Sequence, residues 1–333
     1  MAVPILRRSD CMLKSISKFL FIMSLTILYF QSCSSNKSDS SSQGDNSGPH
    51  SPVDPNLTVR GDGDTLTILN SRSEPIWLIL KQNDRMIENG KKLNKNETYK
   101  FESYREGFYS LTIKVKLKCD DSGQNCQVGQ VENPCPKDNY GCSPDFGTKA
   151  EFTFGCFKDP CVITPQGHPL TSEDNYNLSA VDGYSIPMTI TVNKGNDEGP
   201  HCKNLDASLL KLASCPEDFK FNGDTYSLKV ENPRNKNEII GCYSPQGFLT
   251  GSTIWGGLAK KANENDVINY TCASPMTPEK CRAGPVKMTP YYKNILQANP
   301  DGGLYGFAYD DDRALHKCLK EKTKYTLEIQ DEK

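Results

Sequence analysis

Histidine and long apolar runs are both scarce in this sequence of 333 residues. The four histidines are scattered, with no serine motif or metal-ligand spacing beside them: His50, His168, His201 and His316. A Ser–His nucleophile is therefore unsupported. Neither sign of charge is in large excess, since 39 Lys and Arg residues stand against 41 Asp and Glu residues. This balance does not indicate a nucleic-acid partner.

Apolar residues make up only 36% of the chain, whereas cysteine is plentiful, with 14 cysteines beside 25 glycines and 21 prolines. A small core needs cross-links, so this composition is typical of a loop-rich domain that folds in an oxidising compartment. Zinc binding is not expected, because no tight C-x-x-C pair or neighbouring histidine supplies the usual ligand spacing. The Asp-Asp-Asp-Arg sequence at 310–313 lacks the spacing of a calcium loop. We expect no metal and no cofactor.

The first 33 residues have the pattern of an export signal. Two lysines precede an apolar run at 19–30, which is shorter than the about 20 residues of a membrane helix. The run leads into Phe-Gln-Ser-Cys, which resembles a bacterial lipobox ending at Cys33. Twelve cysteines follow and can pair among themselves, which favours acylation of Cys33 over ordinary cleavage. This predicts a lipoprotein of the bacterial cell envelope, with secretion as the alternative.

A Ser- and Gly-rich segment at 34–56 comes next, and its composition is typical of a flexible tether. The folded domain is expected to span 57–333. The start stays open between Met1 and Met12, because the second methionine begins a more conventional signal. Without residues 1–33 the chain keeps 35 basic and 40 acidic residues, a formal charge of about −5.

Polar and apolar residues alternate through most of the domain, as expected for strands with one buried face. The predicted strands are 65–70, 75–80, 110–119, 150–154, 184–192 and 325–329. The alternation turns Lys116 away from the core and places Glu151 on an exposed or cleft-lining face. Helical spacing occurs at 206–215 and at 289–300, where Thr289 is the expected N-cap.

Several short motifs follow one another in a recognisable order. They are CDDSGQNC (119–126), AEFTF (150–154), SAVDGYSIPM (179–188), SCPEDF (214–219), GCYSP (241–245) and FAYDDD (307–312). In this order they resemble the thaumatin-like protein family over about residues 57–330, and VDGYSIPM and AYDD are the most specific parts. The resemblance implies a mainly β fold. Its parts would be a flattened two-sheet β-sandwich, a small loop lobe at about 119–147 and a disulfide-rich loop and helix lobe at about 203–299.

The resemblance also implies the disulfide pairs. They are Cys119–Cys126, Cys135–Cys142, Cys202–Cys318, Cys215–Cys242 and Cys272–Cys281. Cys156 and Cys161 lie in an insertion and are close enough in sequence to close a small loop of their own. Arg72, Gln246 and Asn299 stand where family members have cysteines, and no unpaired partner is left behind.

In thaumatin-like proteins, one arginine and four acids line a cleft between the sandwich and the disulfide-rich lobe. The matching residues here are Lys116, Glu151, Asn177, Asp182 and Asp310, so two of the five differ. The residues alone leave open that Asp182 caps its own backbone in an Asp-Gly turn. Glycoside hydrolysis requires two carboxyl groups that face one groove. In this chain Glu151 would be the acid and Asp182 the base or nucleophile.

The implied cleft favours binding of a β-glucan or a related polysaccharide by a monomer. Lys116 and Asn177 weaken the sharing of a proton between carboxyl groups, so weak endo-β-1,3-glucanase activity is the alternative. Tyr176 and Tyr184 either flank the bound sugar or, as tyrosines in strands often do, belong to the core. A protein-binding or inhibitor scaffold is a third hypothesis, because one fold serves unrelated tasks.

Overall fold

The structure is a computed structural model, and it describes the domain with several gaps. The described residues are 65–83, 85–103, 107–129, 146–156, 160–193, 202–232, 235–319 and 323–332. All of them belong to the unit Ser51–Lys333. The expected signal, the tether, Cys33 and the Cys135–Cys142 pair lie outside these residues. No helix within the described ranges is long and apolar enough to cross a membrane.

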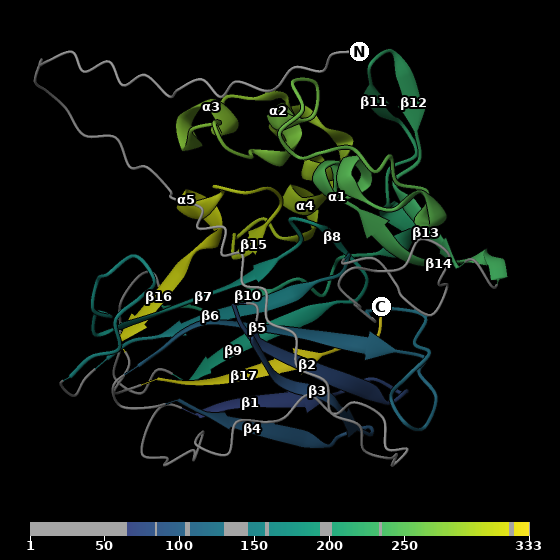
Figure 1. The fold of residues 1–333 in the computed structure, drawn as a ribbon. Coiled ribbons are helices and arrows are strands. Elements are labelled where there is room, and N and C mark those ends of the chain that lie inside the picture. The colour runs from purple at the N-terminus through teal and green to yellow at the C-terminus, as the bar shows by residue number, and fades with distance from the viewer. Residues whose placement is uncertain are drawn as a thin grey trace, which may run out of the picture. The chain divides into compact units, whose positions relative to one another are not determined.

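Two large sheets dominate the described residues (Figure 1). Their strands are β1 Thr65–Asn70, β2 Ile76–Gln82, β3 Arg85–Leu93, β4 Thr98–Glu102, β5 Phe108–Leu117, β6 Lys149–Phe154, β7 Glu173–Ser179, β9 Met188–Asn193, β10 Leu205–Asp206, β15 Leu304–Tyr305, β16 His316–Leu319 and β17 Lys324–Ile329. The five-stranded sheet has the order β10-β9-β17-β1-β4. The seven-stranded sheet has the order β15-β7-β6-β5-β2-β3, with β16 also paired to β7. Most neighbours are antiparallel, but β1 runs parallel to β17.

The core lies between these two sheets. In β6, Ala150, Phe152 and Phe154 are buried, as the alternation predicts. The ring of Phe152 meets that of Tyr325 in the other sheet edge to face, with centroids 5.4 Å apart. Phe154 likewise stacks on Phe101 of β4 at 5.9 Å. The predicted two-sheet sandwich is confirmed, and the alternate residues of each strand are left on its outer faces.

Short strands and helices form a lobe above the sheets in Figure 1. Its elements are β8 Gly183–Tyr184, β11 Phe219–Phe221, β12 Asp224–Tyr226, β13 Lys229–Asn232, β14 Asn235–Tyr243, α1 Pro245–Thr250, η2 Thr253–Trp255, α2 Ile268–Thr271, α3 Pro278–Arg282, η3 Pro285–Met288, α4 Pro290–Ala298 and α5 Asp311–Ala314. Helix α4 begins as predicted, because the Thr289 hydroxyl accepts a hydrogen bond from the Tyr292 N–H at 3.2 Å.

Two predicted elements were wrong in part. The helix expected at 206–215 is reduced to a 3-10 turn, η1 Leu212–Ser214. The cause is Asp206 at the end of β10, whose side chain accepts a hydrogen bond from the Ser208 N–H at 2.7 Å and turns the chain. The strand expected at 184–192 is interrupted around Pro187, which has no N–H to donate. As a result β8 pairs with β14 in the lobe, whereas β9 joins the five-stranded sheet.

Five of the expected disulfides fall on described residues, and all five are formed. They are Cys119–Cys126, Cys156–Cys161, Cys202–Cys318, Cys215–Cys242 and Cys272–Cys281. Arg72 stands where the family resemblance implies a cysteine. Its Nη1 donates to the Gln330 carbonyl at 3.1 Å and lies 3.4 Å from Asp331. A hydrogen bond and an ion pair therefore join the segments that follow β1 and β17, where that cysteine pair is missing.

Candidate functional site

Glu151 and Asn177 lie side by side on the outer face of the seven-stranded sheet. β6 and β7 are antiparallel, and their register places Glu151 opposite Asn177 and Lys149 opposite Ser179. Asn177 is buried and Glu151 is half-buried. With the amide turned so that its nitrogen meets acceptors, Asn177 Nδ2 donates to Glu151 Oε2 at 3.0 Å and to the Leu178 carbonyl at 3.2 Å. An amide thus holds one oxygen of the Glu151 carboxyl.

Asp182 follows β7 and is fixed by side chains from two other segments. Lys149 of β6 forms an ion pair with Asp182 Oδ2, and Gln246 of α1 donates from Nε2 to Asp182 Oδ1 at 3.0 Å. Gly247 lets α1 approach this closely, since a Cβ there would lie 2.0 Å from the Asp182 carbonyl oxygen. Two other side chains therefore bind the Asp182 carboxylate. The turn-cap interpretation instead expects this carboxylate to bond its own backbone.

The contacts form two groups, Glu151 with Asn177 and Asp182 with Lys149 and Gln246, and the charges of Lys149 and Asp182 both act on Glu151. We call these five residues the carboxylate–amide cluster. Burial raises the pKa of the Glu151 carboxyl above its usual 4.5, and the charge of Asp182 acts in the same direction. Lys149, Lys114 and the Asn177 amide lower this pKa without cancelling the rise. Glu151 therefore keeps its proton to a higher pH than an exposed glutamate, beside an aspartate that is paired with a lysine.

Tyr305 bonds the acidic segment at the start of α5 and feels the charge of Glu151. Its hydroxyl donates to Asp311 Oδ1 at 2.7 Å, and burial, Asp311, Glu151 and Asp310 all raise its pKa. Asp310 is buried, and the Tyr292 hydroxyl lies 3.0 and 3.1 Å from its two oxygens. Burial also raises the pKa of Asp310. Sequence reasoning missed Tyr305, whose one signal is its place two residues before the FAYDDD motif.

The sequence profile of the thaumatin family matches residues 70–330. The chain belongs to the thaumatin family. It is 26% identical over 147 residues to a glucan endo-1,3-beta-glucosidase of Prunus avium and 27% identical over 171 residues to thaumatin-like protein 1 of Arabidopsis thaliana. These matches cover 44% and 49% of this chain and 45% and 61% of the relatives. The chain thus spans about half the length of the curated relatives it matches.

Two solved structures match at lower identity. A laminaripentaose-producing β-1,3-glucanase in complex with laminaritetraose is 11% identical, with 82% of this chain and 100% of that chain covered and a TM-score of 0.45. A thaumatin-like xylanase inhibitor is 10% identical, with 79% of this chain and 97% of that chain covered and a TM-score of 0.31.

In this thaumatin-family chain, Lys116 does not belong to the carboxylate–amide cluster. It lies near the end of β5, where its Nζ donates to the Gly123 carbonyl at 3.1 Å. The expectation that it turns away from the sandwich core is met, but the loop closed by Cys119 and Cys126 covers it, so it is buried. This burial lowers the pKa of Lys116. Lys149, in contrast, forms an ion pair with Asp182.

Tyr176 and Tyr184 are buried in the core of the thaumatin-family fold. The Tyr176 hydroxyl donates to the Lys203 carbonyl at 2.7 Å, and the Tyr184 hydroxyl donates to the Lys211 carbonyl at 3.2 Å. Of the two interpretations of these tyrosines, the structure favours the core. Within the described ranges, no group of three or more His, Cys, Asp or Glu side chains is arranged to hold a metal ion.

Proposed function

We propose that this thaumatin-family domain binds a β-glucan or a related polysaccharide at the carboxylate–amide cluster. Sugar hydroxyls both donate and accept hydrogen bonds. The cluster offers carboxylate and amide oxygens as acceptors, and amide and ammonium groups as donors. The presence of a glucan endo-1,3-beta-glucosidase among the relatives supports this class of ligand.

The observation that carries the proposal is the engagement of Asp182. Both of its carboxylate oxygens are held, one by Lys149 and the other by Gln246. A base or nucleophile must direct a lone pair at water or at the sugar, and Lys149 and Gln246 already compete for the lone pairs of this carboxylate. A side chain already held in place suits recognition, because little conformational freedom is lost on binding. The geometry therefore supports binding better than hydrolysis.

Weak hydrolysis of the same polysaccharide is the second candidate, and the raised pKa of Glu151 favours it. A glycosidase acid must hold a proton near neutral pH, and burial is one way to achieve this. Glu151 would then protonate the leaving oxygen, and Asp182 would act as base or nucleophile.

Replacing Glu151 by alanine should weaken binding to insoluble linear β-1,3-glucan by about tenfold or more, because hydrogen bonds to sugar hydroxyls are lost. The measurement is a pull-down of the intact protein at increasing polymer concentration. Glu173→Ala is the matched control, because it removes a carboxylate from the same sheet. Glu173 lies on the surface and pairs with Lys317 at 3.5 Å. Equal binding by all three proteins would place the glucan elsewhere. No binding by the wild type would contradict the proposal and favour a protein-binding scaffold.

We also propose that the exported protein carries a lipid on Cys33, which the lipobox-like sequence and the even number of later cysteines support. Cys33→Ser should move the protein from the membrane fraction to the soluble fraction and abolish its labelling by a fatty-acid analogue. Acylation supplies the apolar surface that binds the bilayer, and it needs this thiol. A variant that still partitions into membranes would rule out anchoring through Cys33.

A further inference from the structure

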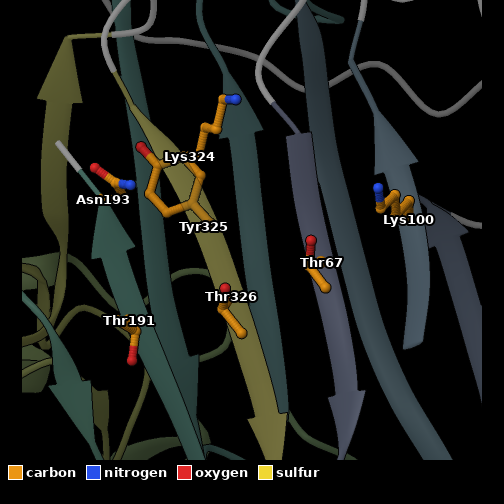
Figure 2. A pocket seen from close by; sticks show the side chains of 7 residues that line it. All are labelled: Thr67, Lys100, Thr191, Asn193, Lys324, Tyr325 and Thr326. Carbon is orange, nitrogen blue, oxygen red and sulfur yellow. The ribbon is translucent and has the colours of Figure 1, made fainter. Parts of the chain in front are cut away.

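An open hollow lies on the outer face of the five-stranded sheet, whereas the carboxylate–amide cluster belongs to the seven-stranded sheet. Its volume is about 290 Å³. The residues that line it are Thr67, Lys100, Thr191, Asn193, Lys324, Tyr325 and Thr326 (Figure 2). None of these lining residues carries a carboxylate.

Three threonines and Lys100 form one row across four neighbouring strands of this face. Thr191 of β9 is opposite Thr326 of β17, which is opposite Thr67 of β1. Thr67 is in turn opposite Lys100 of β4. Figure 2 shows the row crossing the sheet. Because neighbouring strands lie about 4.8 Å apart, the three hydroxyls span about 10 Å.

The polar groups of this row and of Lys324 are available to form hydrogen bonds or ion pairs with a ligand. Among the residues that the structure describes, the three threonine hydroxyls form no side-chain hydrogen bond, and Lys100 and Lys324 form no ion pair. Thr191 and both lysines are exposed, and Thr67 and Thr326 are half-buried. Three hydroxyls and two ammonium groups are thus presented together without protein partners.

The charge of the hollow is opposite to that of the whole chain. Two lysines line it, in a chain with a formal net charge of −2. Glu102 and Glu328 follow Lys100 and Thr326 by two residues, so they lie on the same face, but the described side chains show no pairing of either with these lysines. Unpaired ammonium groups on this face attract a ligand with negative charge.

We propose that this face is a second binding site, and that its ligand is an anionic polysaccharide. Regularly spaced hydroxyls suit a ligand whose hydrogen-bonding groups repeat along its length, as those of a sugar chain do. The lysines add a requirement for carboxylate or sulfate groups, because each supplies a positive point charge. The site is independent of the proposed function, since it shares no residue with the carboxylate–amide cluster.

The test titrates the intact protein with polygalacturonate, dextran sulfate and neutral dextran in a calorimeter. At low salt the wild type should bind an anionic polymer, more weakly as salt is added, and should not bind neutral dextran. Lys100→Gln combined with Lys324→Gln should lower the affinity by about tenfold. Thr326→Val keeps the shape of the central side chain but removes its hydroxyl, and should cost about threefold to tenfold. Binding of one anionic polymer alone identifies the carboxylate or the sulfate as the group recognised.

Two control variants remove the same groups outside the hollow. Lys293→Gln changes an exposed lysine on α4, and Thr98→Val changes an exposed threonine at the start of β4. Both should bind like the wild type, and all variants should unfold at the same temperature. The proposal is overturned if neither anionic polymer binds, or if Thr326→Val and the double lysine variant bind as tightly as the controls. It is also overturned if Glu151→Ala abolishes this binding, because the polymer would then occupy the carboxylate–amide cluster.

Discussion

Replacing both Cys202 and Cys318 by serine should lower the free energy of unfolding by about 4–5 kcal/mol. In the chain-entropy account, a disulfide destabilises the unfolded chain more as the closed loop becomes longer, and this one closes a separation of 116 residues. It also joins the two sheets, because Cys318 lies in β16 of the seven-stranded sheet and Cys202 precedes β10 of the five-stranded sheet. No other described disulfide closes a separation of more than 27 residues.

The matched control is the serine variant of Cys156 and Cys161, which are separated by 5 residues. The same account gives a loss of about 2 kcal/mol for so short a loop. Equilibrium unfolding in urea measures both variants against the wild type. If the two variants lose the same free energy, loop length is not the source of the stabilisation, and local packing around each bond would have to explain it.

The strands were predictable where one face of a sheet is buried and the other is not. Alternation located β1, β6 and β17 and identified Phe152 and Phe154 as core residues. It failed at 206–215, because apolar spacing does not reveal that an Asp206 side chain will bond the backbone and turn the chain. It could not show that 184–192 divides between two sheets, since that choice depends on partners far away in sequence.

The candidate site was predictable to a similar extent. The outward position of Glu151 follows from the period of its strand, and the family resemblance pointed to Asn177 and Asp182. The partners of Asp182 were not predictable, because Lys149 and Gln246 come from a different strand and from the lobe. The burial of Lys116 was missed for the same reason: the loop that covers it folds back from beyond the strand. Contacts between distant segments require the folded structure.

Any hydrolysis by the carboxylate–amide cluster should depend on Glu151. Glu151→Gln should then lower turnover by about 100-fold or more with little change in affinity, because glutamine keeps the shape and most hydrogen bonds but has no acidic proton to give. The pH profile offers a second readout. Burial raises the pKa of Glu151, and the acid form is present below that pKa and lost as the pH rises through it. Turnover should fall over the same interval.

Asn177→Asp tests the same carboxyl from the other direction. It replaces the amide that donates to Glu151 Oε2 by a second carboxylate. The lost hydrogen bond lowered the pKa of Glu151, and the added negative charge raises this pKa, so both changes act in the same direction. Any activity should therefore extend to higher pH in this variant.

The measurement is reducing-end release from linear β-1,3-glucan by the wild type and both variants, with a pull-down on the same polymer. Since Lys149 holds Asp182, we expect strong binding and little product. Product that does not respond to Glu151→Gln would remove Glu151 from catalysis. Substantial product from the wild type that is lost in Glu151→Gln would show that the site is an enzyme.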